Sequence, residues 1–167
     1  MKPQPELSRP IDVSRISPTG DSETIIADPA ECAAIAARLG IPAVHSLKAE
    51  LGLWRWRGAG VRVAGSILAD IEQVCVVTLE PFRNQVSDEV ERYFLPNVSE
   101  SDANADVDPF SDGVIELGET VVESLSLALD PYPRKPGATF EGGNIEDEDP
   151  KEQSPFAALA ALRPKKR

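Results

Sequence analysis

The sequence predicts an α+β domain in which a curled, barrel-like antiparallel sheet packs against one capped helix and one amphipathic helix. Three observations lead to this prediction. Apolar residues recur at helical spacing over residues 28–39, at strand spacing over residues 44–95, and at helical spacing again from residue 118. Glycine and proline residues separate these segments, as they do at the ends of helices and strands.

The N-terminal part of the chain predicts two short strands and a helix. Residues 9–16 and 24–27 combine alternating polarity with β-branched side chains, which is typical of strands. The run Asp28-Pro29-Ala30-Glu31 predicts a helix start, with a capping aspartate, a first-turn proline and the glutamate of a capping box. Gly40 and Pro42 end this helix. Its apolar face consists of Cys32, Ile35, Ala36 and Leu39.

The period-two region predicts four consecutive antiparallel strands at residues 44–53, 61–71, 74–79 and 86–95. Residues 58–60 form a turn between the first two. In the first strand, His45 is predicted to point the same way as Leu47 and Ala49. The connections are short, so we expect a meander that curls and is closed by the helix.

The distribution of charge and of Pro and Gly residues predicts where the domain ends. We expect a domain over residues 1–133, a disordered acidic linker over 134–153 and a short helix with a basic end over 154–167. Within the domain, the sequence predicts an acidic loop at 96–113, an edge strand at 114–117 and an amphipathic helix from Gly118 that stops before Pro131. No Lys or Arg lies between Arg92 and Arg134, so this stretch is purely acidic.

The overall composition limits the classes of partner. The chain has 167 residues, a formal net charge of -11 and a pI near 4.6. Passive binding to a phosphate backbone needs clustered Lys and Arg, so a partner protein or a basic surface is the better expectation. The start of the chain lacks a signal pattern and no apolar run approaches the roughly 20 residues of a membrane span, which predicts a cytoplasmic protein. Two cysteines do not make a disulfide framework and fit a reducing compartment.

Candidate chemistry is sparse, and we expect no catalytic residue, no metal, no cofactor and no small-molecule substrate. His45 is the only histidine, and Cys32 and Cys75 are the only thiols, so a closed zinc site of the usual Cys/His kind cannot be assembled. Carboxylates between Glu100 and Glu123 lack the spacing of a calcium loop. The sequence therefore predicts a protein that is not an enzyme.

The run Trp54-Arg55-Trp56-Arg57 alternates aromatic and basic side chains at the end of a strand. Together with Arg62 it forms a candidate RNA patch, because aromatic rings stack on bases and guanidinium groups contact phosphates. The alternative is that one tryptophan belongs to the core and the other covers it.

Three segments are informative in combination. They are a Thr-Leu-Glu-Pro-Phe strand end after Cys75, the run Ile-Glu-Leu-Gly-Glu at the start of the amphipathic helix, and the terminal run Ser-Pro-Phe-Ala-Ala-Leu-Ala-Ala-Leu. In this order they resemble the YceD family of large-subunit (23S) ribosomal RNA accumulation proteins, from about Arg9 to the C-terminus. The matching positions are Cys75, Pro81, Phe82, Glu116, Leu117, Gly118 and Glu123.

This resemblance implies a non-enzymatic bacterial factor needed for normal accumulation of the large-subunit ribosomal RNA, in a family often encoded beside a small large-subunit ribosomal protein. Many members have a Cys-x-x-Cys pair just before the Pro-Phe pair. Here Thr78 takes the place of the second cysteine, so a structural strand is the simpler interpretation.

Our leading hypothesis is an assembly adaptor for ribosome biogenesis. The acidic loop and linker would screen a basic ribosomal protein or assembly factor, and Phe156, Leu159 and Leu162 of the terminal helix would anchor the partner. Two alternatives remain open: the terminal helix packs on its own domain, or the barrel binds ribosomal RNA directly through the candidate RNA patch.

Overall fold

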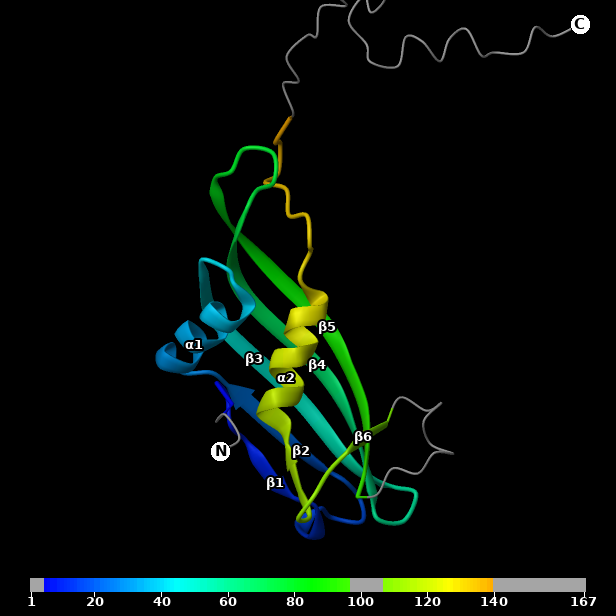
Figure 1. Ribbon diagram of the computed structural model, residues 1–167. Coiled ribbons are helices and arrows are strands. Elements are labelled where there is room, and N and C mark those ends of the chain that lie inside the picture. Colours follow the sequence, from blue (N-terminus) through cyan, green and yellow to red (C-terminus); the bar gives the residue numbers. More distant parts are fainter. Residues whose placement is uncertain (1–4, 97–106, 140–167) are drawn as a thin grey trace, which may run out of the picture.

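Three long antiparallel strands form the centre of the computed structural model, which describes residues 5–96 and 107–139 (Figure 1). In chain order, the elements are β1 (Pro10–Asp12), the 3-10 helix η1 (Val13–Arg15), β2 (Asp21–Ile26), α1 (Pro29–Leu39), β3 (Ala43–Trp56), β4 (Gly60–Val74), β5 (Pro81–Leu95), β6 (Val107–Pro109), β7 (Val114–Glu116) and α2 (Leu117–Ala128). A five-stranded sheet has the order β2-β3-β4-β5-β6, and β1 pairs with β7 in a separate two-stranded sheet. The α+β class is confirmed.

The strands β3, β4 and β5 confirm three of the four predicted period-two segments. β3 pairs with β4 from Ala43 opposite Glu72 to Trp56 opposite Gly60. Every second side chain of β3 from Leu47 to Leu53 is buried, as the alternation predicts. The turn at residues 57–59 joins the two strands, and all three strands extend further than the apolar pattern indicates.

The third of the four predicted strands, at residues 74–79, is wrong. β4 ends at Val74, and the following residues form the connection to β5. The backbone N–H of Cys75 donates to the Glu80 carbonyl, and the Cys75 carbonyl accepts from the N–H of Leu79. Both hydrogen bonds are 2.9 Å long. Leu79 also has φ 58, outside the extended region. These hydrogen bonds reverse the chain, so the apolar residues here belong to a turn and not to a ladder.

The two helices lie on one face of the sheet (Figure 1). Asp28 caps α1 and forms the predicted capping box with Glu31, while Gly40 ends the helix with φ 66 in the left-handed region. Ile35 of α1 and Leu125 of α2 are fully buried against the sheet. Burial of each such side chain contributes about 1.5–3 kcal/mol, so the core lies between the helices and this face.

The opposite face of the sheet carries no helix in the described ranges, and we refer to it as the open face. The outer strands β2 and β6 do not pair with each other, so the sheet is not closed and the expected barrel-like shape is not confirmed. α1 and α2 already bury the apolar face. Closure is therefore not needed to remove that surface from water.

The predicted strand at residues 9–16 is shorter than expected and lies outside the main sheet. Only β1 is extended. The chain then turns into η1, where the Asp12 carboxylate accepts from the Ser14 N–H at 2.8 Å. β1 pairs with β7, placing Ile11 opposite Ile115. The N-terminal segment is thereby tied to the start of α2, which begins directly after β7.

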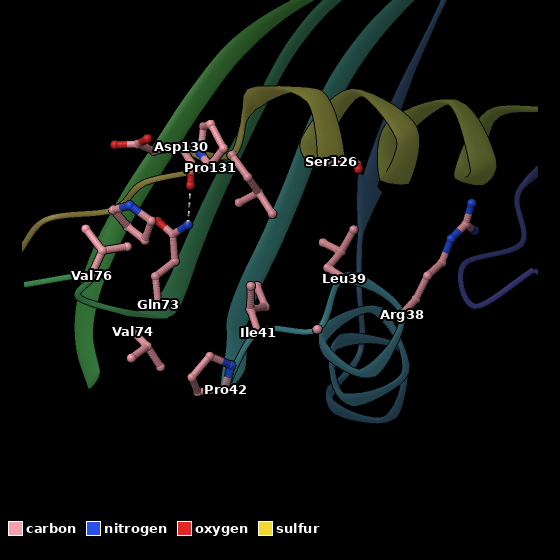
Figure 2. Close-up of a pocket in the computed structure, with 13 residues that line it drawn as sticks. Arg38, Leu39, Ile41, Pro42, Gln73, Val74, Val76, Ser126, Asp130 and Pro131 are labelled. Carbon is pink, nitrogen blue, oxygen red and sulfur yellow. Dashed lines mark hydrogen bonds between the residues drawn. The ribbon is translucent and has the colours of Figure 1, made fainter. Parts of the chain in front are cut away.

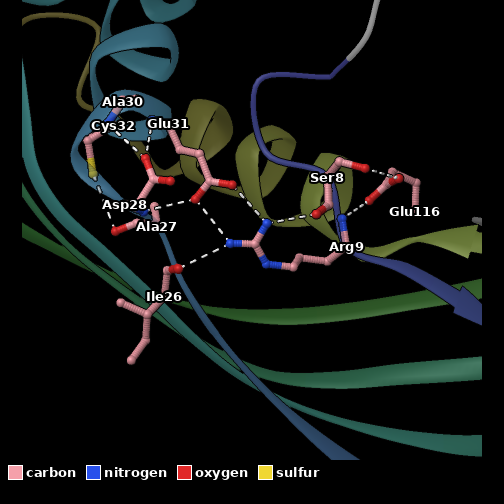
Figure 3. A network of polar contacts seen from close by, with 9 residues as sticks. All are labelled: Ser8, Arg9, Ile26, Ala27, Asp28, Ala30, Glu31, Cys32 and Glu116. Carbon is pink, nitrogen blue, oxygen red and sulfur yellow. Dashed lines mark hydrogen bonds and ion pairs between the residues drawn. The ribbon is translucent and has the colours of Figure 1, made fainter.

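Arg9 connects this N-terminal segment to α1 and β2 (Figure 3). Its guanidinium lies 2.8 Å from the Glu31 carboxylate and donates to the Ile26 carbonyl at 3.3 Å. Its backbone N–H donates to the carboxylate of Glu116. The hydrogen bond from Arg9 lowers the pKa of Glu31 below its usual value. One side chain therefore holds three elements together.

The acidic part of the chain is described only partly. β6 lies within the predicted acidic loop and pairs in parallel with β5. β7 and α2 confirm a strand and an amphipathic helix at the predicted positions, but β7 pairs with β1 and does not add an edge to the main sheet. Lys135, in the predicted linker, lies 3.0 Å from Glu80 of the β4–β5 turn. Residues 140–153 of that linker and the predicted helix at 154–167 lie outside the described residues. None of the described helices is long and apolar enough to cross a membrane.

Candidate functional site

An aromatic and basic cluster lies on the open face next to the β3–β4 turn. Strand register places Trp54 opposite Arg62, and Arg62 opposite Tyr93. The Trp56 and Tyr93 rings are 4.7 Å apart, and the Arg57 guanidinium lies 4.3 Å from the centre of the Trp56 ring. We call these five residues the aromatic cluster. It contains four of the five residues of the candidate RNA patch. Tyr93 was missed by the sequence analysis because its place beside Trp56 depends on strand pairing.

Trp54 forms a flat surface within this cluster. A Cβ added at Gly52 would lie 2.2 Å from the indole, and one added at Gly20 would lie 2.5 Å from it, so the ring packs directly against backbone. Trp54 remains 39% exposed, and Trp56 is half-buried. The alternative that one tryptophan belongs to the core is therefore wrong. Glycine at these two positions makes room for the indole, and the Arg62 guanidinium lies 5.4 Å from the centre of the Trp54 ring.

Arg55 does not belong to the aromatic cluster. Neighbouring strand residues point to opposite faces, so Arg55 lies on the helix side of the sheet. There it donates to the backbone carbonyls of Ser14 and Ile16 at 3.2 and 3.1 Å. Its role in the described structure is to hold the η1 segment against the end of β3.

The charge of Arg62 is balanced within the aromatic cluster. Its guanidinium donates to the Glu91 carboxylate at 2.9 Å, and the Tyr93 hydroxyl donates to the same carboxylate at 2.8 Å. These hydrogen bonds, from Tyr93 first and then Arg62, lower the pKa of Glu91. The cluster thus offers aromatic surface, but Glu91 offsets part of its positive charge.

His45 is exposed, so its predicted place on the buried face is wrong. The register of β3 shifts between Val44 and Ser46, and this bulge puts Val44 in the core and turns His45 outward. Its Nε2 atom lies 3.5 Å from the Glu72 carboxylate. Within residues 5–96 and 107–139, no three His, Cys, Asp or Glu side chains are grouped so that they could hold a metal ion.

Cys75 is fully buried at the β4–β5 turn, and its thiol accepts a hydrogen bond from the Thr78 N–H at 3.5 Å. Hydrogen bonding by the Thr78 side chain, supported by backbone N–H groups of Lys135, Thr78 and Val77, lowers the pKa of the Cys75 thiol to about 6. Cys32 is also free, and burial raises its pKa. Thr78, which stands where many family members have the second cysteine, therefore interacts directly with the Cys75 sulfur.

We expect the stability of the protein to depend on pH through Cys75. Because folding lowers the thiol pKa to about 6, its ionisation stabilises the fold fully above the unfolded pKa near 8.5, and this contribution disappears as the pH falls through 6. Urea unfolding between about pH 5 and 9 should show a rise in stability that Cys75→Ser lacks. Cys32→Ser is the matched control and should keep the rise. Parallel profiles for wild type and Cys75→Ser would contradict this assignment.

Three positions that match the family pattern lie at the start of α2, and they pack against or bind the N-terminal segment. They are Glu116, Leu117 and Gly118. Glu116 accepts from the backbone of Arg9 and from the Ser8 hydroxyl, the latter at 3.0 Å. A Cβ added at Gly118 would lie 2.0 Å from the Leu7 carbonyl oxygen. Leu117 is fully buried. These positions explain why the N-terminal segment and α2 fit closely together.

Two further family-type contacts lie elsewhere in the fold. Glu123 of α2 lies 3.6 Å from Arg92 of β5, which also pairs with Asp108 of β6 at 3.3 Å. Pro81 begins β5, and Phe82 beside it is half-buried. Both sets of contacts fix the position of β5 relative to its neighbours.

An apolar groove of about 560 Å³ lies between the C-terminal ends of α1 and α2 and the β4–β5 turn (Figure 2). Gln73 is buried in its wall, donates to the Asp130 carbonyl at 3.2 Å and accepts from Asn84. Arg38 at the rim is paired with Glu6 and Glu119. The polar groups of Gln73 and Arg38 are thus occupied by structural contacts.

The predicted anchor residues Phe156, Leu159 and Leu162 lie outside the described residues. Their role remains a prediction.

These features define a two-layer α+β domain with an open sheet face, an aromatic cluster and a strongly paired network of surface charges. The chain belongs to the YceD family, because the family model of the large ribosomal RNA subunit accumulation protein YceD matches residues 63–163. The family name points to a role in the accumulation of the large-subunit ribosomal RNA. No curated protein and no solved structure matches the chain.

Proposed function

We propose that this protein is a non-enzymatic ribosome biogenesis factor that supports the synthesis, processing or stability of the large-subunit ribosomal RNA. It acts in this proposal as an acidic adaptor for a basic ribosomal protein or assembly factor in the cytoplasm. Family membership supports the pathway. The distribution of charge supports the adaptor role.

One observation carries the adaptor proposal: most basic side chains of the described domain are already paired with carboxylates. Such pairs are worth little for stability when exposed, but they neutralise the positive charges locally. Asp and Glu outnumber Lys and Arg in the chain, which has a net charge of -11, so carboxylates without a cation partner remain on this domain. A basic partner gains from this surface, whereas a bare phosphate backbone is repelled. The paired cations are Arg9, Arg38, Lys48, Arg62, Arg83, Arg92 and Lys135.

Deletion of the gene tests the function as a whole. We expect the ratio of large-subunit to small-subunit ribosomal RNA to fall, and a plasmid copy of the gene should restore it. Sucrose-gradient profiles should show a matching deficit of large subunits. An unchanged ratio and profile, in a strain with no second copy, would contradict a role in ribosome biogenesis.

Truncation after Gln153 tests the proposed anchor residues Phe156, Leu159 and Leu162. Loss of an apolar helix on a tether should weaken co-purification of basic partners by about tenfold or more, because the anchor and the acidic surface act together. The melting temperature should not change. Undiminished partner recovery would contradict the anchor, and a lowered melting temperature would favour packing of this segment on its own domain.

The aromatic cluster supports a second candidate, direct binding of single-stranded RNA. The exposed indole of Trp54 and the neighbouring guanidinium groups are the kind of surface on which bases stack, each worth about 1–3 kcal/mol. Local charges act within about 10 Å at moderate salt, so an acidic total does not exclude this site.

Binding of a labelled single-stranded RNA of about 12 nucleotides, within the usual site size of such domains, separates the two candidates. Trp54→Ala and Arg57→Glu should each weaken binding by about tenfold if the aromatic cluster is the RNA site. Arg83→Glu is the matched control, because Arg83 is paired with Asp70 at the other end of the open face. RNA retention that is equal in all variants would reject direct binding at this cluster.

A further inference from the structure

The outer edge of β2 presents backbone groups that no other strand of the described chain pairs with. β2 is the first strand of the five-stranded sheet and has a neighbour, β3, on one side only. The N–H of Ala27, just beyond β2, donates to Leu47 of β3 at 3.0 Å, and Ile25 lies opposite Ala49. Antiparallel pairs alternate between bonded and non-bonded residues, so the backbone N–H and C=O groups of Ser22 and Thr24 point away from β3.

The contact made by Ile26 supports this direction. Ile26 follows Ser22 and Thr24 in the set of alternate β2 residues whose backbone groups point away from β3. Its carbonyl accepts a hydrogen bond from the Arg9 guanidinium at 3.3 Å on this outer side (Figure 3). The outer edge of β2 is thus accessible to a hydrogen-bonding group, and Arg9 marks its upper end.

β1 and the outer edge of β2 run near each other without pairing (Figure 1), and the residues that line two hollows place a cleft between them. Two adjoining hollows of about 320 and 190 Å³ make up the cleft, and both are lined by Pro10, Ile11 and Glu23. The apolar residues of their walls include Ile16, Ile25 and Leu53. The cleft therefore offers an apolar floor beside free backbone groups.

The rim of the cleft carries a surplus of negative charge. Asp12, Asp21 and Glu23 line it, with Arg15 as the cation at the same hollow. Asp12 and Asp21 accept hydrogen bonds from the backbone N–H groups of the turns beside them. The Glu23 carboxylate makes no hydrogen bond or ion pair within the described part of the chain, so its charge is available to a ligand.

We propose that the outer edge of β2 is the docking site for an extended, basic segment of the adaptor's protein partner. The segment adds as a strand and pairs with the backbone groups of Ser22 and Thr24. Its alternate side chains enter the cleft on the side of Asp21 and Glu23, where Lys or Arg residues complement the carboxylates. This inference rests on the proposed adaptor function and specifies where the partner binds and what its sequence must look like.

The test uses the full-length protein and labelled synthetic peptides that cover the basic extensions of the large-subunit ribosomal proteins. The peptides have about 12 residues, which is longer than most strands. We expect fluorescence anisotropy to identify at least one peptide that binds and whose affinity falls with added salt. Its binding should shift the NMR signals of the Ser22 and Thr24 amides.

Two substitutions alter the edge in different ways. Thr24→Pro removes the outward N–H without removing a β2–β3 hydrogen bond, a change that edge strands tolerate. Glu23→Lys reverses the free charge. Each should weaken peptide binding by about tenfold. Glu89→Lys is the matched control, since it makes the same charge change at an exposed position of β5, and it should change binding by less than about twofold.

Three outcomes would overturn the proposal: no peptide binds at moderate salt, the peptides bind equally to wild type and both edge variants, or the shifted amides lie elsewhere. The experiments distinguish failure of this docking site from failure of the proposed biogenesis role. If the edge variants lose peptide binding yet fully restore the ribosomal RNA ratio in the deletion strain, this docking site is wrong as the functional contact and the biogenesis role stands. If deletion itself leaves the ratio unchanged, the biogenesis role fails.

Discussion

Replacement of Gly118 by alanine should destabilise the protein by about 1–3 kcal/mol, the usual cost of overpacking. In an ordinary helix interior the same change stabilises by about 1 kcal/mol. Here the new Cβ would lie 2.0 Å from the carbonyl oxygen of Leu7, which is backbone and cannot rotate away. Either α2 or the N-terminal segment must move. Leu7 is fully buried, so movement of its segment also opens the core.

Urea unfolding followed by circular dichroism measures this effect. Ser126→Ala, at an exposed position of the same helix, is the control and should change the stability by less than about 0.5 kcal/mol. The N-terminal segment should also become easier to cleave with a protease in Gly118→Ala. A stability equal to or above that of the wild type would show that α2 and the segment around Leu7 do not pack as described.

Truncation of Leu125 to alanine should cost about 2–5 kcal/mol, the range for a buried leucine that leaves a cavity. Leu125 lies at 0% exposure in the core between α2 and the sheet. For a protein of this size, the loss corresponds to a fall in melting temperature of roughly 4–20 °C.

Leu127→Ala is the matched control, because the same substitution falls two residues further along α2 at a side chain that is 78% exposed. It should alter the melting temperature by roughly 2 °C or less. Equal losses in the two variants would contradict the assignment of the buried face of α2.

The comparison of helices shows which part of the fold could be predicted from the sequence. α1 begins and ends as predicted, because Asp28, Glu31 and Gly40 act on backbone groups within a few residues of themselves. α2 was likewise predicted from the spacing of Val121, Val122 and Leu125. Both signals are local, so no knowledge of the rest of the chain was needed.

The errors in the strands have the opposite cause. The apolar run at 74–79 has the composition of a strand but forms a turn, because its backbone hydrogen bonds close between Cys75 and Glu80. The bulge after Val44 reverses the direction of His45, and one residue of slip exchanges the two faces of a strand. Neither the turn nor the bulge changes the spacing of apolar residues in the sequence, so neither could be predicted from it.

The candidate site was predictable to the extent that it depends on neighbours in the chain. The run Trp54-Arg55-Trp56-Arg57 predicted a strand end that carries aromatic and basic side chains. It did not show that Tyr93 joins the aromatic cluster, that Glu91 pairs with Arg62 there, or that Arg55 holds the η1 segment. Those contacts join residues far apart in the sequence.

Composition and local spacing were enough to predict the α+β class, the capped helix, the acidic balance of charge and the resemblance to the YceD family. The open sheet, the pairing of β1 with β7 outside it and, within the described residues, the free edge of β2 beside an acidic cleft became visible only in the folded chain. Strand partners and edges are set by long-range packing, in which the burial of one apolar face under both helices outweighs local preference.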